Sequence, residues 1–373
     1  MDSSATDAVL DTLFLPIRHG RLAWPSGGTC LDAADGNAPA VLFLRARAGG
    51  VLSGCRLPGL VCEQTFKPEV DELMHTGHPV ILPGEDPPVP GGYALVLVLP
   101  PRQRDEARTL LARAVMAAAP GGRVLACASN NEGARSVQAD LERLAGPVEV
   151  MVKNKCRVFW SGPLQGAADP MLAQAWVRLD APRRIAGGRY VSRPGLFAWD
   201  RIDPASALLG SLLPLDLAGH AADLGAGHGY LSVQLLERCP GIEALDVIDA
   251  ERRALDLARV NLAPFQARIA IDFLWHDVMA GLARRYDVIV TNPPFHAQRG
   301  ADRPDIGRRF LAAAAQALAG GGRLWLVANR HLPYEAELAR GFAAVHTIAQ
   351  AGGFKVIEAV KARRQASRAA VSR

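Results

Sequence analysis

An internal repeat limits how this chain can fold more than any other feature of the sequence. The segment YALVLVLPPR at 93–102 aligns without gaps with YDVIVTNPPF at 286–295. In both halves a helix-like run, a Gly-Gly pair, an apolar strand and a strand–turn–strand pattern then follow in the same order. Chance likeness between alanine-rich helices does not produce this whole order. The repeat therefore predicts two copies of one fold within the 373 residues, rather than one large domain.

Strand-like and helix-like segments alternate through the second half of the chain. Apolar strands such as IEALDVID and YDVIVTN are separated by runs with helical spacing such as AERRALDLARVNLA. Alternation of this kind builds a mostly parallel sheet with helices on both faces. The final segment, VHTIAQAGGFKVIEAV, has two strands around Gly-Gly and predicts a hairpin. We expect an α/β fold in which each copy is a doubly wound, mostly parallel sheet with a C-terminal antiparallel hairpin.

The two copies differ at the positions where a ligand would bind. Leu99 and Arg102 of the first copy replace Asn292 and Phe295 of the second, and the first copy has no glycine-rich turn like the one at 225–229. If one copy is an enzyme, it is therefore the second. The expected boundaries are 1–165 for the first domain, 166–193 for a linker rich in Gly and Pro, 194–360 for the second domain and 361–373 for a basic tail.

Charge and cysteine content narrow the function only slightly. The net charge is +5, yet the tail at 361–373 alone contains five basic residues and no acidic one, so bulk charge does not identify the partner. The six cysteines form no C-x-x-C pair, which argues against zinc and against a disulfide framework. The sequence shows neither a signal-peptide pattern nor an apolar run of membrane-spanning length. We expect a monomeric cytoplasmic protein with no membrane partner and no metal.

A glycine-rich turn follows the first strand of the second copy. DLGAGHGYL places Gly225, Gly227 and Gly229 directly after an apolar run, where glycine lets the backbone turn tightly and approach a ligand. Many α/β folds need such a turn for structural reasons alone. The spacing G-x-G-x-G behind Asp223 differs from the G-x-G-x-x-G dinucleotide fingerprint and suits a nucleoside ligand without a pyrophosphate.

Acidic residues end the next two strands. Asp249 lies 20 residues after Gly229, at the tip of its strand, where a carboxylate can accept hydrogen bonds from both ribose hydroxyls. Asp246 is the competing candidate, but it lies within the apolar run. Capping of the following helix is a structural alternative for Asp249. Asp277 closes the third strand, where it could accept from an adenine amino group or could be a polar strand end.

The fourth strand ends in TNPPF, although two prolines cannot continue a strand ladder. The side-chain oxygen of Asn292 and the carbonyl of Pro293 provide two adjacent acceptors, which fit an NH2 group on a planar ring. Holding both amino hydrogens would aim the nitrogen lone pair at an electrophile, an effect of positioning more than of base catalysis. Phe295 would stack on the ring. In a doubly wound sheet the end of this strand faces the glycine-rich turn across a crevice, and His228 and His296 flank that crevice. The structural alternative is a proline-terminated strand with a surface phenylalanine.

Together, these segments resemble the bacterial 16S ribosomal RNA guanine-N2 methyltransferase family. The resemblance rests on DLGAGHGYLS, TNPPFH, GGRLWLVANRHLPY, GGFKVIEA and PGLFAWDRIDPASALL in the second half, and on SNNEGARS and NKCRVFW in the first. From FLPIRHGRLAWPSGG to about position 90 the chain departs from the family pattern. The resemblance implies two tandem Rossmann-like methyltransferase domains and the cofactor S-adenosylmethionine.

Carried over to this chain, the resemblance implies that the second domain binds the cofactor and the target guanine. The implied cofactor-binding residues are Asp223, Gly225, Gly227, Asp249, Asp277 and Asn292, and the implied catalytic residues are Asn292, Pro293 and Phe295. The implied substrate-binding residues are Pro294, Phe295, His296 and Lys355. In the family the first domain has lost cofactor binding and assists RNA recognition and stability, which agrees with the degenerate first copy.

The predicted function is S-adenosylmethionine-dependent methyl transfer to the exocyclic N2 of a guanine in 16S ribosomal RNA. The expected partner is ribosomal RNA or the small ribosomal subunit, and a stacked guanine would have to be extruded. Because other amino-methylating enzymes share NPPF, the alternatives are 23S guanine-N2, N6-adenine and protein-glutamine methyltransferases. Outside the enzymes, the alternative is an RNA-binding ribosome assembly factor.

Overall fold

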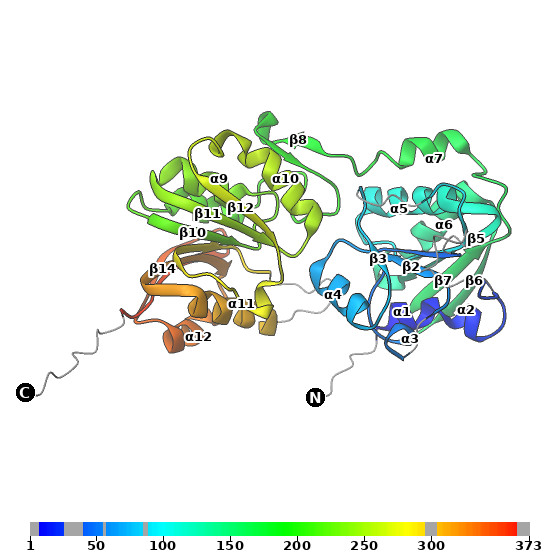
Figure 1. Ribbon diagram of the computed structural model, residues 1–373, viewed down its shortest axis with the longest axis horizontal. Coiled ribbons are helices and arrows are strands. Elements are labelled where there is room, and N and C mark those ends of the chain that lie inside the picture. Colours follow the sequence, from blue (N-terminus) through cyan, green and yellow to red (C-terminus); the bar gives the residue numbers. More distant parts are fainter. Residues whose placement is uncertain (1–6, 26–39, 55–56, 85–88, 295–303, 364–373) are drawn as a thin grey trace, which may run out of the picture. The chain divides into compact units, whose positions relative to one another are not determined.

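The computed structural model describes residues 7–25, 40–54, 57–84, 89–294 and 304–363, and it divides the chain into two compact units (Figure 1). Unit 1 comprises Met1–Ala181 and Arg193–Gly195, and unit 2 comprises Pro182–Ser192 and Leu196–Arg373. In the described part of the chain, no helix is both long and apolar enough to cross a membrane.

Unit 1 is built on a seven-stranded sheet in the order β3-β2-β1-β4-β5-β7-β6. The first five strands in this order are parallel, and β6 and β7 form an antiparallel hairpin at one edge. The strands are β1 (Val41–Leu44), β2 (Leu60–Glu63), β3 (Val80–Ile81), β4 (Tyr93–Val98), β5 (Ala118–Ser129), β6 (Val148–Lys153) and β7 (Cys156–Ser161). The helices are α1 (Ala8–Leu13), α2 (Leu15–Arg18), α3 (Val51–Gly54), α4 (Lys67–His75), α5 (Arg104–Ala117), α6 (Ala134–Ala145) and α7 (Pro170–Trp176).

Unit 2 contains a second seven-stranded sheet, in the order β12-β11-β10-β13-β14-β16-β15, and a separate hairpin of β8 and β9. The strands are β8 (Arg183–Ile185), β9 (Tyr190–Ser192), β10 (Ala218–Leu224), β11 (Gly241–Asp249), β12 (Ala270–Trp275), β13 (Tyr286–Thr291), β14 (Leu318–Asn329), β15 (Ala344–Ala351) and β16 (Phe354–Val360). The helices are α8 (Pro204–Leu212), α9 (Tyr230–Arg238), α10 (Arg252–Leu262), α11 (Pro304–Ala317) and α12 (Tyr334–Gly341).

The two sheets have the same strand order when β1 is matched with β10 and the following strands in turn, ending with β7 and β16. The register agrees as well, because Leu44 pairs with Val98 in unit 1 where Leu224 pairs with Thr291 in unit 2. The gap-free alignment of the two repeat segments is therefore confirmed. The predicted α/β fold with two doubly wound sheets and C-terminal antiparallel hairpins is confirmed with it.

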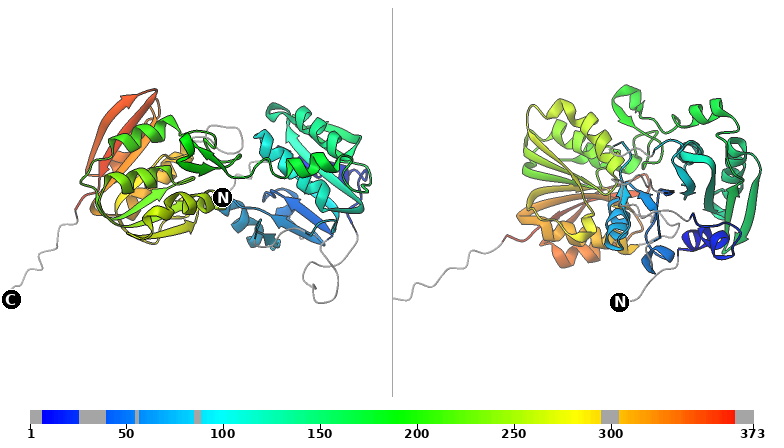
Figure 2. Two further views of the ribbon diagram at one scale, coloured as in Figure 1. Left: turned by 90° about the horizontal axis from the view of Figure 1, so that it is seen from above. Right: turned by 45° about the vertical axis from the view of Figure 1, so that its right-hand side comes forward.

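Apolar side chains cover both faces of the sheet in unit 2. Val288 and Val290 of β13 join the core layer formed with α8, α9 and α10, while Ile289 joins the layer formed with α11 and α12. Figures 1 and 2 show these helix groups on opposite sides of the sheet. Because a central parallel strand is buried on both faces, its sequence is an uninterrupted apolar run instead of an alternating one.

The range 166–193, expected as a linker, is folded at both ends. Helix α7 begins after the N-cap Asp169 and buries Trp176 in the core of unit 1, where the hydroxyl of Thr109 donates to the Trp176 carbonyl at 2.8 Å. The other end forms the hairpin β8–β9 of unit 2. Glycine and proline in this range form turns and the start of a helix between short elements. A high content of these residues is also typical of linkers, and the prediction of a linker is based on that content.

Candidate active site

The carboxyl ends of β10, β11, β12 and β13 meet at one edge of the sheet in unit 2, because these strands are parallel. Gly225 and Asn292 each come one residue beyond the last paired row of β10 and β13. Asp249 is the last residue of β11, where it pairs with Trp275. Asp277 follows the end of β12. The structure thus brings together, at one sheet edge, residues that are up to 67 positions apart in the sequence.

The glycines of the turn after β10 have different tasks. Gly225, Gly227 and Gly229 all have positive φ, at 72°, 57° and 88°, a region that glycine enters without steric cost. A Cβ on Gly229 would lie 3.3 Å from the Cβ of Ala258, so this glycine allows α9 and α10 to pack. A Cβ on Gly227 would meet no atom within 4 Å. The space beside Gly227 is therefore open to a ligand.

Asp249 ties the tip of β11 to the glycine turn. Its Oδ2 accepts from the backbone N–H of Gly227 at 2.7 Å, and its Oδ1 accepts from the N–H of Glu251 at 2.7 Å. Burial raises the pKa of Asp249 to about 6, although these backbone hydrogen bonds act in the opposite direction. The helix-capping alternative does not apply, because Glu251 is the N-cap of α10. Each carboxylate oxygen retains acceptor capacity for a ribose hydroxyl.

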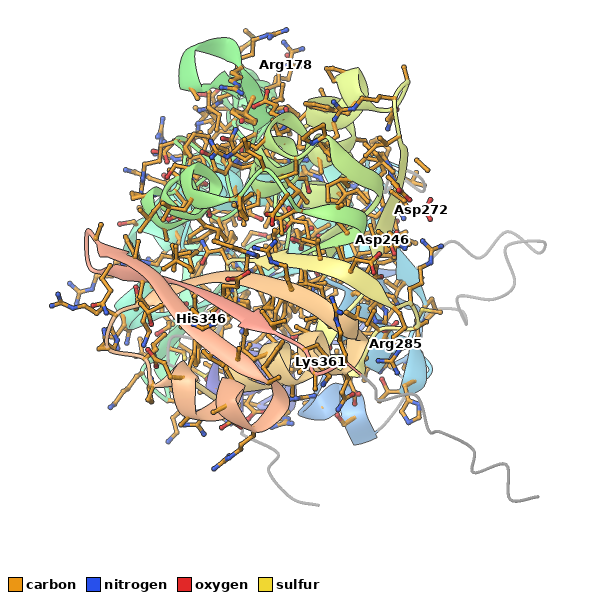
Figure 3. All side chains as sticks on the ribbon, turned by 90° about the vertical axis from the view of Figure 1, so that its left-hand side faces the viewer. Arg178, Asp246, Asp272, Arg285, His346 and Lys361 are labelled. Carbon is orange, nitrogen blue, oxygen red and sulfur yellow. The ribbon has the colours of Figure 1, made fainter. Side chains whose placement is uncertain are left out.

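Asp246, the competing candidate, makes hydrogen bonds to other side chains of unit 2. It is buried within β11 and accepts hydrogen bonds from the hydroxyl of Tyr286 at 2.7 Å and from Arg284 Nη1 at 2.8 Å. Its register partner on β12 is Asp272, and Figure 3 labels both. Tyr286 begins β13, so this network lies toward the amino ends of the strands, away from the turn. The preference for Asp249 over Asp246 therefore agrees with the geometry.

Asp223 is fully buried behind the glycine turn. Its Oδ2 accepts from the backbone N–H of Ser232 at 2.9 Å and from the Ser232 hydroxyl at 2.7 Å. Burial raises the pKa of Asp223 to about 7, with the two hydrogen bonds from Ser232 acting in the opposite direction. Its other oxygen, Oδ1, has no hydrogen-bond partner among the described residues. Asp223 therefore anchors the start of α9 with one oxygen and keeps the second unpaired.

Asp277 is half-buried and caps a short 3-10 turn, Val278–Ala280, by accepting from the backbone N–H of Met279 at 2.9 Å. This contact matches the structural alternative of a polar strand end. A role toward adenine stays a prediction.

Asn292 is held in one orientation by two residues at the start of α8. Its Nδ2 donates to Asp203 Oδ2 at 3.0 Å and to Ser206 Oγ at 2.9 Å. The Asp203 carboxylate can only accept, so it requires the nitrogen of the amide to face it. The amide oxygen Oδ1 then points away, and it is buried with no partner among the described residues. The next residue, Pro293, is buried, and Pro294 is exposed.

Among the remaining predicted substrate residues, Lys355 is at this sheet edge by register, because it pairs with Ala328, one residue before the end of β14. Phe295 and His296 lie outside the described residues. Lys355 is a buried residue of β16, and its Nζ donates to Leu332 O at 2.7 Å and to Glu335 Oε1 at 2.6 Å. These contacts give Lys355 a role inside the chain, and a substrate role stays a prediction.

Unpaired polar atoms gather around the glycine turn and the tip of β13. Asp223 Oδ1, His228 Nδ1 and Asn292 Oδ1 are all buried without a hydrogen-bond partner in the described part of the chain. Burial also lowers the pKa of His228, which favours a neutral ring. Buried polar groups are normally paired, so unpaired ones at one edge indicate a place for a polar ligand. Together with the open space at Gly227, they fit a nucleoside-like cofactor and a base with donor groups.

A family model, related sequences and a solved structure all match this chain, and all three are methyltransferases. A model of the Methyltransferase small domain matches residues 187–358. Ribosomal RNA small subunit methyltransferase C of Pseudomonas aeruginosa (strain LESB58) is 30% identical over 269 residues, covering 72% of this chain and 80% of that protein. The protein of the same name from Salmonella paratyphi A is 30% identical over 263 residues, covering 70% and 74%. The solved T. thermophilus 16S rRNA N2 G1207 methyltransferase (RsmC), in complex with AdoMet and guanosine, matches with a TM-score of 0.74 and 26% identity over 95% of this chain and 92% of that chain.

The chain belongs to the ribosomal RNA small subunit methyltransferase C family. This confirms the resemblance found in the sequence, the two-domain methyltransferase fold and the prediction of an enzyme.

In this member of the small subunit methyltransferase C family, unit 1 closes the equivalent sheet edge with its own side chains. By register, Arg45 stands where unit 2 has Gly225, with a φ of 53°. Arg45 Nη1 donates to the carbonyl of Leu99, the residue that replaces Asn292, at 3.5 Å. A long charged side chain therefore crosses from the first strand to the fourth where unit 2 has a glycine.

Gln64 completes the closure of this edge in unit 1. By register it stands where unit 2 has Asp249. Its Oε1 accepts from the backbone N–H of Phe66 at 2.9 Å, and its Nε2 donates to Ala46 O at 2.5 Å. The amide thus reproduces the tie between strand tip and loop that Asp249 makes in unit 2. It does so without the carboxylate that a ribose needs.

Asp203 and Ser206 contact the Asn292 amide, and neither is among the site residues predicted from the sequence. Asp203 followed by Pro204 is a readable helix-start signal, and Asp203 does cap α8 by accepting from the N–H of Ser206 at 2.8 Å. The signal does not reveal that the same carboxylate reaches Asn292, because the two residues are 89 positions apart.

Proposed function

We propose that this protein transfers the methyl group of S-adenosylmethionine to the exocyclic N2 of a guanine in 16S ribosomal RNA. The observation that carries the proposal is the amide of Asn292, whose nitrogen is fixed by Asp203 and Ser206 while its buried oxygen lacks a described partner. An oriented acceptor at a strand tip, followed by Pro293, fits an amino group on a planar ring. The names of the relatives specify small-subunit ribosomal RNA, and that of the T. thermophilus enzyme specifies N2 of a guanine.

In the proposed reaction the chain holds the amino group and sets its direction. Asn292 Oδ1 accepts one N2 hydrogen, and the carbonyl of Pro293 accepts the other. Holding both hydrogens reduces the conjugation of the nitrogen with the ring and leaves its lone pair directed away from both acceptors. S-adenosylmethionine supplies an electrophilic methyl group when it is bound.

The glycine turn and the acidic strand ends are the proposed cofactor site. Asp249 accepts from the ribose hydroxyls, Asp277 from the adenine amino group, and Gly225 and Gly227 let the cofactor approach the backbone. Asp223 offers its unpaired oxygen to the cationic end of the cofactor. The open space at Gly227 and the free acceptor capacity at Asp249 support this arrangement.

The target base is proposed to lie against Pro293 and Pro294, with Phe295 stacked on its ring and His296 beside it. Lys355 stays a proposed substrate contact, although its ammonium is bound to Glu335. Since the T. thermophilus enzyme is named for G1207, we propose the equivalent guanine as the target in this protein.

Unit 1 is proposed to bind no cofactor and to serve RNA recognition and stability. Its sheet edge, closed by Arg45 and Gln64 with Leu99 in place of Asn292, supports this division of roles. We infer that the protein acts as a monomer in the cytoplasm, on ribosomal RNA or the small subunit.

Mass spectrometry of ribosomal RNA nucleosides from a deletion strain tests the reaction. We expect one N2-methylguanosine to disappear from 16S RNA and to return when the wild-type gene is restored. Loss of N6-methyladenosine, or loss of N2-methylguanosine from 23S RNA instead, would assign the protein to one of the alternative substrates. Unchanged nucleosides in both RNAs would favour the RNA-binding assembly factor.

The substitution Asn292→Ala tests the amino-group clamp. We expect kcat on RNA from the deletion strain to fall by about 100- to 1000-fold, the loss typical of a preorganised polar group at a reacting centre. Asn329→Ala is the matched control, because the half-buried Asn329 ends the neighbouring strand β14 and takes no part in the proposed clamp. It should leave kcat within about twofold. Methylation by Asn292→Ala at the wild-type rate would refute the proposed clamp.

A further inference from the structure

The loop that leads into α8 presents an aromatic ring to solvent. Phe197 is 73% exposed. Among the described residues, the other large apolar side chains with high exposure are aliphatic or methionine. It lies six residues before Asp203, which holds the Asn292 amide. Six residues of chain span at most about 20 Å, so the ring lies within a few nucleotides of the base clamp.

The backbone of this loop is fixed in an unfavourable conformation. Ala198, directly after Phe197, has a φ of 46°, in the left-handed region that residues with a Cβ rarely adopt. The backbone N–H of Arg201 donates to the carbonyl of Ala198 at 3.2 Å and closes the turn. Backbone strain of this kind persists where the surrounding structure enforces it, and it clusters at ligand-binding sites. The exposed ring therefore belongs to a defined turn.

A basic hairpin contributes to the same surface. The guanidinium of Arg183 on β8 lies 5.3 Å from the centre of the Trp199 ring, two residues after Phe197. Arg183 and Arg184 are both exposed. Arg184 Nη1 donates to the carbonyl of Gly188 at 2.9 Å within the hairpin, and the nearby Arg189 and Arg201 pair with Glu237 and Asp200.

The hairpin is also anchored to the cofactor-binding turn. The side chain of Asn261 accepts from Val191 N at 2.7 Å and donates to Val191 O at 2.9 Å. The same amide nitrogen donates to the carbonyl of His228, within the glycine turn, at 2.8 Å. The ring of Tyr190 lies 5.8 Å from the ring of His228. The basic surface is thus held in a fixed relation to the site inside unit 2.

We propose that Phe197, Arg183 and Arg184 bind unpaired nucleotides that flank the target guanine. One base stacks on Phe197, and the adjoining phosphate contacts the arginines of the hairpin. Phe197 is two residues from Trp199, whose ring contacts Arg183. An aromatic ring and guanidinium groups on neighbouring segments match both parts of a nucleotide, its apolar base face and its anionic phosphate. This inference rests on the proposed function, since it concerns the RNA that enters that active site.

The substitution Phe197→Ala tests the stacking contact in the full-length protein. With unmethylated 16S RNA from the deletion strain, we expect KM to rise about tenfold or more, the usual effect of removing one stacking platform. The Kd for S-adenosylmethionine, measured by calorimetry, should not change. Phe197→Trp should restore the wild-type KM, because tryptophan offers the same flat surface. Leu215→Ala is the matched control, since Leu215 is 69% exposed but precedes β10, at the opposite edge of the sheet.

The arginines are tested by salt dependence. Arg183→Gln should lower the slope of log KM for RNA against log salt concentration by about one, the value expected for one lost phosphate contact. Arg340→Gln, at an exposed arginine of α12, should leave the slope unchanged.

Two outcomes would overturn the inference. One is an unchanged KM for RNA in Phe197→Ala, and the other is a weakened Kd for S-adenosylmethionine with no effect on RNA, which would make Phe197 a cofactor contact. If the wild-type protein itself failed to methylate RNA, the proposed function would fail first. The two failures are therefore distinguishable in one set of measurements.

Discussion

At the scale of single residues, the site depends on how one amide is oriented. The sequence already indicates Asn292 as a candidate, because an asparagine before two prolines at a strand tip has few structural reasons to be there. Its orientation could not be predicted, because it depends on Asp203 and Ser206 at the start of a helix far away in the sequence. A buried amide with its oxygen unpaired costs free energy. The contacts to its nitrogen are what keep that oxygen available.

The substitution Asp203→Asn separates this positioning role from helix capping. Asparagine caps a helix about as well as aspartate, so the midpoint of thermal unfolding should change little. An amide at position 203 can present either NH2 or oxygen to Asn292, so the orientation of that side chain is no longer enforced. We expect kcat to fall by about tenfold or more with KM for RNA unchanged, as for other losses of alignment at a reacting centre. A fall in thermal stability with kcat preserved would show that Asp203 serves the helix alone.

The buried carboxyl of Asp249 predicts a pH-dependent affinity for the nucleoside part of the cofactor. Its pKa of about 6 means that it is largely protonated at pH 5 and ionised at pH 8. Ribose hydroxyls donate to the carboxylate, so affinity should rise with pH through about 6 and level off above 7. The probe is 5′-methylthioadenosine, which keeps ribose and adenine but has no amino acid group that titrates.

Calorimetry from pH 5 to pH 8 measures this effect. The limiting change is tenfold in Kd for each pH unit below the pKa. Asp223 also titrates nearby, with a pKa of about 7, so the measurement is repeated with Asp223→Asn. The rise should persist in that variant, and a Kd independent of pH would contradict the role of Asp249.

At the scale of elements, the repeat made most of the fold readable. Strand order, the position of the glycine turn and the terminal hairpin follow from patterns that recur in both halves. The short elements between 166 and 193 were missed, because a strand of three residues such as β9 carries almost no local signal. The partner that fixes it, Asn261, is 70 residues away from Val191. Long-range contacts of this kind leave no pattern in a single sequence.

The glycine turn allows binding and folding to be separated by two matched substitutions. Gly229→Ala places a Cβ against Ala258 and Leu262 at a φ of 88°, so we expect a clear loss of thermal stability. Gly227→Ala has the same backbone penalty, roughly 1–2 kcal/mol for a left-handed residue, but meets no neighbour. Its loss of stability should be smaller, while its affinity for S-adenosylmethionine should fall sharply. Thermal unfolding and calorimetry on both variants make the comparison, and equal binding by Gly227→Ala and wild type would place the cofactor elsewhere.

At the scale of the whole molecule, one strand order occurs twice, with different side chains at the carboxyl edge of each sheet. The sequence predicted the replacement of Asn292 by Leu99, since those strands align without gaps. It did not predict how unit 1 closes its sheet edge, because the first strands of the two halves have diverged beyond recognition. The register of β1 and β2 reveals Arg45 and Gln64 at the places of Gly225 and Asp249. At this edge of unit 1, Arg45 and Gln64 make their own contacts where unit 2 has Gly225 and Asp249.

This closure predicts one bound cofactor for each full-length chain. The Arg45 side chain reaches the carbonyl of Leu99, and both polar atoms of the Gln64 amide are bonded to backbone groups of unit 1. Calorimetric titration with S-adenosylmethionine should therefore give a stoichiometry of one. Gly227→Ala should abolish that binding in unit 2 without revealing a second site. Gln64→Asp should leave the stoichiometry at one, because Arg45 still stands at the place of Gly225. A stoichiometry of two in the wild-type protein would mean that unit 1 opens its edge to the cofactor, and the division of roles between the two units would have to be abandoned.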